Sequence, residues 1–539
     1  MPKKLETSFG NYFKLPNPGL RAYFQHVVSG QPDEYRTPFY KGRSVTSLLA
    51  EWDSTLCQIQ GKYPELYKFE KDLGKKVGPM SVMKPLNDRL PDIDSYYDSI
   101  LLESKPVSDE AIRSACREWS DVAGIRVRGQ ARTVDTMKKS TNSGSPYFTK
   151  RLRVIDDTVP VRIYRVRESG HTVTKMDMNG RIWNAAAVLG WRGQEGGPTK
   201  EDVKQRVVWM FPFGVNIAEL QCYQPLIEAM QSGLEPHIPA WVSMEAVDRA
   251  ITKMFDTKAP NDLVICTDFS KFDQHFNKDL QNCAASCLAQ LFTHDRAFDE
   301  WITDVFPVKY DIPLAFNWNQ IRYGAHGMGS GSGGTNADET LAHRCLQHEA
   351  AISSGMVLNP NSQCLGDDGV LTYPGITVED VMSAYTSHGL EMNKEKQYAS
   401  THDCVYLRRW HDKDYRVNGV CAGVYSTNRA LGRLCEQERW YNPEVWGRDK
   451  VALRQLSILE NCKYHPLKEE FADFCMKGDK FRLGLDLPGF LDNIERYAKE
   501  ATDYMPDFLG YTRSLQRDGS PRLAGISNWW IVNYLKSKA

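Results

Sequence analysis

One short segment, residues 364–371, restricts the possible folds of this chain more than any other. Two apolar runs, 363–365 and 369–373, flank a polar turn, a pattern that predicts two short strands in a hairpin. The turn contains adjacent carboxylates, Asp367 and Asp368, which repel each other and contribute nothing to packing. A divalent cation would compensate them, because Mg²⁺ prefers carboxylate oxygens and leaves coordination positions for phosphate and water.

A second acidic position follows an earlier apolar run. Residues 263–267 predict a short buried strand that ends at Asp268, and Asp273 follows five residues later. An isolated Gly-Asp-Asp is more often an ordinary surface turn. Two strand-borne acidic sites in one domain, however, can hold two metal ions a few ångströms apart, which is the arrangement that activates a 3′-hydroxyl and stabilises a leaving pyrophosphate. The order and spacing of the two sites therefore predict a metal-dependent centre.

A glycine-rich loop separates the two acidic segments. Residues 327–334 are mostly glycine and serine, and they lead through Thr335 and Asn336 into a helix expected over 338–351. Small residues let the backbone approach a ligand closely, and hydroxyl groups supply short hydrogen-bonding arms. A flexible linker is the alternative interpretation, which the helix that follows directly makes less attractive.

The charges are balanced over the whole chain but not along it. The 539 residues include 67 Lys and Arg against 68 Asp and Glu, a formal net charge of −1. This excludes a uniformly basic nucleic-acid coat protein. Residues 131–167 nevertheless carry nine Lys and Arg against three Asp, a local charge of +6. Because net charge does not report where charges lie, the composition is compatible with a nucleic-acid enzyme that has a local basic patch.

Cysteine usage and hydropathy indicate a reducing, intracellular environment. The thirteen cysteines are an odd number with no Cys-x-x-Cys pair, so a disulfide framework is not expected. No apolar run approaches the length of a membrane span, and the N-terminus has no apolar segment typical of a secretory signal. The nearby residues His343, Cys345 and His348 do not share one helix face, which argues against a metal site there.

The acidic segments and the loop between them, taken in order, resemble the motifs of viral RNA-dependent RNA polymerases of right-hand architecture. The resemblance is greatest to the enzymes of picobirnaviruses, with partitivirus polymerases as relatives, and it spans residues 140–410. The matching segments are 268–273 for motif A, 330–335 for motif B, 366–368 for motif C, 389–396 for motif D, 406–409 for motif E, 204–206 for motif F and 141–146 for motif G.

The resemblance implies roles for the residues of the metal and triphosphate sites. Asp268 and Asp367 would be the main ligands of two Mg²⁺ ions, for which Mn²⁺ can substitute, and Asp368 would be a supporting ligand. Lys204 and Arg206 would neutralise the incoming triphosphate, a task suited to forked and point cations.

Further implied roles concern the leaving group and the RNA. Lys396 would protonate the pyrophosphate as a general acid, with Lys394 as the alternative. The residues expected to line the template entrance are Ser143, Gly144 and Pro146, and those expected to contact the growing strand are Arg408 and Arg409.

Selection of ribonucleotides would depend on the 2′-hydroxyl, which both donates and accepts hydrogen bonds. Asp273 is placed to read this hydroxyl together with Ser330 and Thr335, and Gly331 belongs to the same loop. A reverse transcriptase would be expected to carry a bulky aromatic residue near the position of Asp273.

The chain departs from the family pattern at one position. Many relatives have an asparagine four residues after the motif B threonine, and it assists sugar selection, but here that position is Glu339. Either Asn336 substitutes for the asparagine through a shifted helix start, or the role of the amide is absent.

The resemblance implies an α+β fold shaped as a right hand, with an antiparallel palm sheet, fingertips that close the hand and a mostly helical thumb. The expected boundaries are 1–240 for the N-terminal region and fingers, 241–274 for the palm with motif A, 275–315 for a fingers insertion, 316–410 for the rest of the palm and 411–539 for the thumb. Local patterns also predict helices over 108–122, with Ser108 or Asp109 as N-cap, and over 378–388.

The expected function is template-directed RNA synthesis from NTPs that replicates and transcribes a double-stranded RNA viral genome, with primer-independent initiation. The alternatives are a reverse transcriptase-like polymerase and a non-catalytic RNA-binding protein associated with a capsid. The expected partners are the RNA template and product, NTPs and the viral capsid protein, with no membrane. The expected state is a monomer located in the virion interior and the host cytoplasm.

Overall fold

The computed structural model describes residues 8–232, 235–502 and 525–539. The chain divides into two compact units. The first comprises Met1–Gly30, Pro85–Trp191 and Val207–Cys404, and the second comprises Gln31–Lys84, Arg192–Arg206 and Val405–Ala539. Each unit draws on three separate stretches, so the chain interleaves the two units instead of joining them by a linker.

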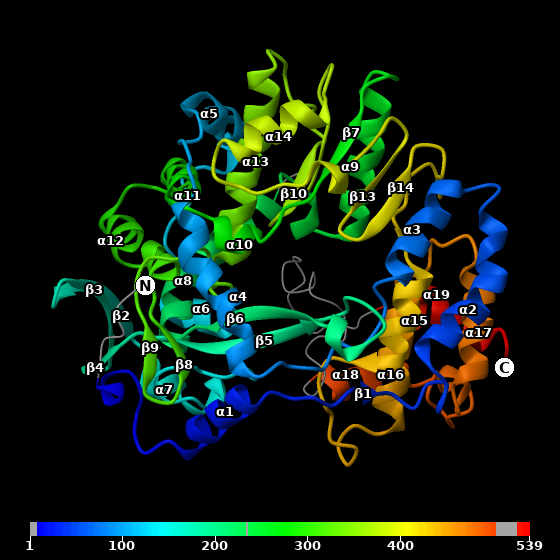
Figure 1. Ribbon diagram of the computed structural model, residues 1–539, viewed down its shortest axis with the longest axis horizontal. Coiled ribbons are helices and arrows are strands. Elements are labelled where there is room, and N and C mark those ends of the chain that lie inside the picture. The colour runs from blue at the N-terminus through cyan, green and yellow to red at the C-terminus, as the bar shows by residue number, and fades with distance from the viewer. Residues whose placement is uncertain (1–7, 233–234, 503–524) are drawn as a thin grey trace. The chain divides into compact units, whose positions relative to one another are not determined.

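The first unit contains both helices and strands (Figure 1). Its helices are α1 (Pro18–Ser29), α4 (Leu86–Asp98), α5 (Asp109–Glu118), α6 (Gln130–Thr136), α7 (Ile155–Thr158), α8 (Phe213–Gln231), α9 (Met244–Thr257), α10 (Phe272–His275), α11 (Lys278–Leu291), α12 (Arg296–Asp304), α13 (Thr335–Ser353) and α14 (Val378–Thr386). Its strands, together with those that cross its boundary, are β2 (Val161–Glu168), β3 (His171–Met178), β4 (Arg181–Asn184), β5 (Ala187–Gln194), β6 (Lys204–Met210), β7 (Val264–Thr267), β8 (Leu314–Asn317), β9 (Gln320–Arg322), β10 (Gln363–Leu365), β11 (Asp368–Leu371), β12 (Tyr398–Ser400) and β13 (Asp403–Tyr406).

A four-stranded sheet with the order β10-β11-β7-β12 lies at the centre of the first unit. All three pairings are antiparallel. Every residue of β7 is buried, as are the apolar residues of β10 and β11, which explains the unbroken apolar runs in these strands. The predicted strand over 263–267 and the predicted hairpin around residue 367 are both confirmed.

Helix α13 packs against β10 and against α5, α11 and α14 (Figure 1). Most of its residues are buried, including polar ones, and buried polar groups must find hydrogen-bond partners. Gln347 donates from Nε2 to the Gln363 carbonyl at 2.8 Å, and Arg344 pairs with Glu118 at 2.9 Å. The helix is therefore held to the sheet and to α5 by specific polar contacts as well as by apolar packing.

The three predicted helices are confirmed: α13 extends beyond both ends of the predicted 338–351, whereas α5 and α14 end before their predicted C-terminal residues. Ser108 caps α5, because its hydroxyl accepts from the Ala111 amide, but the helix stops at Glu118 and a 3-10 turn follows. Helix α14 ends at Thr386, two residues before the predicted end. Gly389 then has φ +81°, the left-handed conformation that glycine adopts most readily after a helix.

The first unit contains two further sheets. One has the antiparallel order β2-β3-β4, and the other has the order β6-β5-β8-β9. Within the second of these sheets, β5 and β8 run parallel. Strands β5 and β6 carry the chain out of the first unit and back into it.

The second unit is mostly helical. It contains β1 (Tyr35–Arg36), α2 (Val45–Leu56), α3 (Pro64–Gly74), β14 (Arg409–Asp412), β15 (Val424–Tyr425), α15 (Thr427–Cys435), β16 (Glu436–Gln437), α16 (Arg448–Glu460), α17 (Lys468–Gly478), α18 (Ile494–Thr502) and α19 (Trp530–Lys536). Its core joins residues from both ends of the chain, including Trp52 of α2, Leu456 of α16 and Ile531 of α19.

A fully buried ion pair links α13 to the segment that precedes β8. Lys309 Nζ lies 3.0 Å from Asp338 Oδ2, and neither side chain is exposed to solvent. Asp338 also accepts from the hydroxyls of Tyr223 at 2.7 Å and Tyr310 at 2.6 Å. A buried charge is tolerated only when it is paired and hydrogen-bonded in this way.

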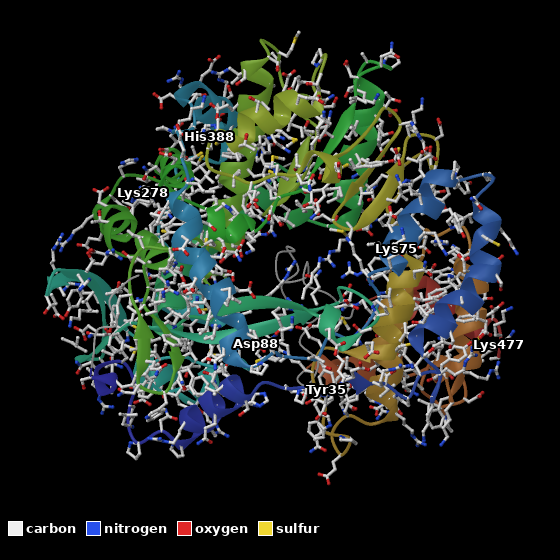
Figure 2. The ribbon with its side chains drawn as sticks, viewed as in Figure 1. Tyr35, Lys75, Asp88, Lys278, His388 and Lys477 are labelled. Atoms are coloured by element: carbon white, nitrogen blue, oxygen red, sulfur yellow. The ribbon has the colours of Figure 1, made fainter. Side chains whose placement is uncertain are left out.

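We therefore expect Asp338→Ala to destabilise the chain strongly, by about 3–5 kcal/mol, because it removes the carboxylate that pairs directly with the buried Lys309 ammonium. The free energy of unfolding, measured by urea denaturation, tests this. The matched control is Lys278→Met at the start of α11, where the lysine is exposed (Figure 2) and the change should stay within about 0.5 kcal/mol. Equal effects of the two substitutions would contradict the expectation.

Candidate active site

Three carboxylates collect at one end of the central sheet. In the β11–β7 ladder Gly369 pairs with Thr267, and one step further in the same antiparallel register Asp368 faces Asp268. Asp367 occupies the two-residue turn between β10 and β11. Side chains directly opposite in an antiparallel pair lie about 5 Å apart, and like charges there repel each other. Asp268 and Asp367 are exposed and Asp368 is partly exposed, so their carboxylates can coordinate a cation from solvent.

Two side chains of helix α13 form hydrogen bonds with the backbone of this turn. The Gly366 amide donates to Thr340 Oγ1 at 2.9 Å, and His343 Nδ1 lies 2.9 Å from the Gly366 carbonyl. Burial lowers the pKa of His343 to about 4, so the ring is neutral at physiological pH and its Nδ1 proton is the donor. Gly366 has φ +58°, as required at the first position of a type II′ hairpin turn.

Close packing excludes any side chain at Gly369. A Cβ atom there would lie 2.6 Å from His343 Cε1 and 2.9 Å from Thr267 Oγ1. The role of Thr340 and His343 in holding the turn was not predicted, although their i, i+3 spacing on a predicted helix places them on one face. Only the fold shows that this face meets the turn.

Gln397, which directly precedes β12, forms hydrogen bonds with the backbone of Asp268. Its Oε1 accepts from the Asp268 amide at 2.9 Å, and its Nε2 donates to the Asp268 carbonyl at 2.8 Å. The side chain is buried. Nothing in the sequence distinguishes this glutamine, because the contact depends on the pairing of β12 with β7.

The two lysines considered for proton transfer differ in their surroundings. Lys394 pairs with Glu379 at 2.6 Å in an exposed ion pair. Lys396 is exposed, directly precedes Gln397, and has no ion-pair partner among the residues that the structure describes. Of the two, Lys396 therefore has the ammonium group that is available to a ligand near Asp268.

Asp273 shares a hydrogen bond with Glu339, the residue at the family's usual asparagine position. Burial raises the pKa of Glu339 well above its ordinary value, and the neighbouring Asp273 carboxylate raises it further. Two carboxyl groups can share a hydrogen bond only if one is protonated, and the raised pKa makes Glu339 the member of the pair that holds a proton more readily. Asn336 is engaged elsewhere, because its Oδ1 accepts from the Trp241 indole at 2.8 Å.

The glycine-rich loop is pinned to β6 and α8. Ser330 Oγ donates to the Val207 carbonyl at 3.1 Å, and the Trp209 amide donates to the Ser330 carbonyl at 3.0 Å. Buried Glu219 of α8 accepts from the Ser332 hydroxyl and from the Gly333 amide. The loop therefore has a defined conformation and does not resemble a flexible linker.

Contacts at the two ends of this loop are equally close. Thr335 Oγ1 donates to the Gly329 carbonyl at 3.4 Å. A Cβ atom on Gly331, which has φ +146°, would lie 1.7 Å from the Trp209 carbonyl oxygen. A Cβ atom on Gly334 would lie 2.2 Å from the Tyr223 ring. Glycine is required at both positions.

The residues predicted to line the template entrance form a tight buried loop. Ser143 and Pro146 are buried, and the Ser143 hydroxyl accepts from the Thr149 amide at 3.1 Å. Gly144 has φ +60°, and a Cβ atom there would lie 2.7 Å from the Phe211 carbonyl oxygen. The buried residues of this loop therefore fix its backbone conformation.

The remaining predicted residues belong to the second unit. Lys204 and Arg206 are exposed and lie two residues apart on β6, so they share one face of the strand. Arg408 is exposed at the turn between β13 and β14, 3.9 Å from Glu195. Arg409 is buried and donates to the Gly423 carbonyl at 3.2 Å.

Comparison with known proteins identifies the family of this chain. The family model described as viral RNA-dependent RNA polymerase matches residues 123–464. The chain belongs to the viral RNA-dependent RNA polymerases. It is 65% identical over 534 residues, 98% of each chain, to a protein of a human picobirnavirus (strain Human/Thailand/Hy005102/-) described as a potential RNA-dependent RNA polymerase.

Solved polymerase structures cover the whole chain. The crystal structure of the RNA-dependent RNA polymerase of a human picobirnavirus matches with 63% identity and a TM-score of 0.94. The structure of an insertion loop deletion mutant of such a polymerase matches with 60% identity and a TM-score of 0.92, and both comparisons cover all of each chain. The predicted family, the RNA-directed RNA polymerase activity and the mixed α+β viral polymerase fold are thereby confirmed.

Membership of the family also sets the substrates. A polymerase of this kind takes an RNA template and NTPs, and the family uses divalent metal ions. None of the described helices combines the length and the apolar character that a membrane crossing requires.

The packing of the glycine-rich loop on β6 generates a prediction for the polymerase. Gly331→Ala should reduce RNA synthesis by about a hundredfold, because the added methyl group forces the loop away from Trp209 and displaces the residues that follow. The rate of NTP incorporation on an RNA template measures the loss. Gly129→Ala, whose new methyl group would meet no atom within 4 Å, should keep nearly full activity. A fully active Gly331→Ala enzyme would contradict this view of the loop.

Proposed function

We propose that this polymerase replicates and transcribes a double-stranded RNA viral genome by a two-metal mechanism, with primer-independent initiation. The main support is the β11–β7 register, which brings the strand-end Asp268 to face Asp368 beside Asp367 in the turn. Three acidic groups at one sheet end are a hard oxygen donor set that suits Mg²⁺, with Mn²⁺ as a substitute.

In this mechanism Asp268 and Asp367 would hold the two ions, and Asp368 would support them. The ions, when bound, activate the 3′-hydroxyl of the growing RNA and neutralise charge on the triphosphate. The 3′-oxygen forms a bond to the α-phosphorus while the bond to pyrophosphate breaks. Thr340, His343 and Gln397 act as positioning residues, because their hydrogen bonds fix the backbone that carries the aspartates.

Cationic residues are proposed to complete the reaction. Lys396 would deliver a proton to the departing pyrophosphate, a role supported by its exposure and by the Glu379 ion pair that occupies Lys394. Lys204 and Arg206 would bind the triphosphate, and Arg408 would contact the backbone of the growing strand.

Sugar selection is proposed to depend on a carboxyl pair. Asp273 would accept a hydrogen bond from the ribose 2′-hydroxyl, next to Ser330 and Thr335. The neutral Glu339 acid would orient Asp273 by donating to it, which is the task that an amide performs in relatives. Glu339 would then take the place of the missing motif B asparagine, without a substitution by Asn336 and without loss of the asparagine's role.

The right-hand assignment remains part of this proposal. The palm would comprise 241–274 and 316–410, where the central sheet lies, the fingers 1–240 and 275–315, and the thumb 411–539. A monomer that works inside the virion and in the host cytoplasm, in contact with the capsid protein, would complete the biological setting.

Two other functions receive less support. A reverse transcriptase would carry an aromatic residue near the position of Asp273, and this chain has the acid. A non-catalytic RNA-binding protein would have no reason to keep three clustered carboxylates and the hydrogen bonds that position them.

The double substitution Asp367→Ala with Asp368→Ala tests the metal site. We expect RNA synthesis with Mg²⁺ to fall by a factor of about a thousand or more, since loss of the ions removes several kcal/mol of transition-state stabilisation. Primer extension with NTPs on an RNA template measures the loss. Asp299→Ala, at an exposed carboxylate of α12, is the matched control and should remain active. Incorporation by the double variant at the control rate would disprove the catalytic assignment.

Substitutions at Glu339 test sugar selection separately. Glu339→Gln keeps a hydrogen-bond donor toward Asp273 and should preserve the preference for NTPs over dNTPs. Glu339→Ala removes the donor, and Asp273→Ala removes the acceptor, so each should reduce that preference by about tenfold or more. The ratio of kcat/KM for NTP and dNTP measures the preference. Unchanged discrimination in both alanine variants would contradict the proposed role of the pair.

A further inference from the structure

Four cysteines from three packed helices converge inside the first unit. Cys283 and Cys287 are four residues apart on α11 and share one of its faces, Cys345 belongs to α13, and Cys116 belongs to α5. The sulfur atoms of Cys283, Cys287 and Cys345 all lie within 4.8 Å of one another. Cys116 lies beside this group, because α5 packs against both α11 and α13 and the neighbouring Cys287 side chain lowers the pKa of the Cys116 thiol. All four side chains are buried.

Burial alone does not distinguish these residues. Twelve of the thirteen cysteines are buried, and cysteine often fills cores as a small apolar side chain. Convergence does distinguish them, because the sulfur atoms of three of them, from two different helices, lie within 4.8 Å of one another.

The spacing of the sulfur atoms fits a single thiophilic ion. Cys287 Sγ lies 3.5 Å from Cys345 Sγ, much longer than the roughly 2.05 Å of a disulfide bond. Tetrahedral zinc binds thiolates at about 2.3 Å, which places neighbouring sulfur atoms roughly 3.8 Å apart. The thiols therefore stand near ligand spacing before any ion is present.

Histidines near Cys345 do not belong to this group. His343 is directed to the Gly366 carbonyl, and His348 Nε2 lies 2.7 Å from Glu118. These two histidines and Cys345 therefore do not point to one common site. Cys345 instead lies near Cys283 and Cys287 of α11.

We propose that Cys283, Cys287 and Cys345, with Cys116 as the fourth ligand, form a structural zinc site. Sulfur ligands select zinc over the hard ions that carboxylates bind, and a closed set of four leaves no position for a substrate. Each thiol gives its proton to solvent as its bond to zinc forms. No oxidant or reductant is needed.

Such a site would tie α13 to α5 and α11 near the reaction centre. Cys345 lies two residues after His343, which holds the Gly366 turn. The ion would thereby fix the helix that supports the acidic turn without touching the substrates. This inference is independent of the proposed mechanism, because a retained zinc ion is measured without any assay of RNA synthesis.

Metal analysis of the purified full-length chain tests the proposal. The protein is reduced, incubated with ZnCl₂, washed with EDTA to remove weakly held ions, and passed through a gel-filtration column. We expect about one zinc per chain to remain by mass spectrometry. The variant Cys283→Ser, Cys287→Ser, Cys345→Ser should lose about nine-tenths of it, whereas Cys222→Ser, at a buried cysteine of α8 outside the group, should retain it.

Cobalt spectroscopy on the unmodified chain keeps the test decisive if the triple variant does not fold. Co²⁺ bound by thiolates should give an intense sulfur-to-metal charge-transfer band and the ligand-field bands of a tetrahedral site. The aspartates have no sulfur and cannot produce this band. Absence of retained zinc together with absence of the band would overturn the proposal, as would a disulfide between Cys287 and Cys345 in the freshly purified protein.

Discussion

The antiparallel pairing of β11 with β7 is the constraint on which the rest of the site depends. It makes Asp268 and Asp368 face each other, an arrangement that costs up to about 1 kcal/mol when both are charged. Four hydrogen bonds oppose this repulsion: Thr340 and His343 bind Gly366, and Gln397 binds both backbone groups of Asp268. At roughly 1 kcal/mol each, they are large enough to offset the repulsion between Asp268 and Asp368.

Helix α13 connects most of the functional features. Its first residue, Thr335, ends the glycine-rich loop, Glu339 shares a hydrogen bond with Asp273, and Thr340 and His343 hold the acidic turn. Asp338, which forms the buried ion pair with Lys309, and Cys345 of the cysteine group also belong to this helix. The proposed sugar selection and the proposed metal site would thereby be coupled to the stability of the fold through α13.

The features that could be predicted from sequence are the local ones. The strand that ends at Asp268, the hairpin with Asp367 in its turn and the helix after the glycine-rich loop follow from apolar runs and turn residues, which depend on near neighbours. Gln397 and the raised pKa of Glu339 could not be predicted, because each depends on a residue more than sixty positions away. Burial of a polar contact has no local sequence signature.

Charge shows the same limit. The basic segment 131–167 was predicted as a nucleic-acid patch, but two of its arginines also serve the fold: Arg165 pairs with Asp311, and Arg151 donates to Asn216 at 2.9 Å. Burial lowers the pKa of Arg151 to about 10. Arg409 is likewise buried, whereas Arg408 beside it is exposed. Sequence identifies where cations are abundant, and only packing decides which of them reach solvent.

The central claim is that Asp268 and Asp367, brought together by strand pairing, hold the reactive cations. Anomalous X-ray scattering from crystals soaked in MnCl₂ and a non-hydrolysable NTP tests it directly. We expect manganese peaks within ordinary ligand distance of both carboxylates and of the triphosphate. Manganese bound elsewhere, with these two carboxylates lacking a metal while the nucleotide is present, would contradict it.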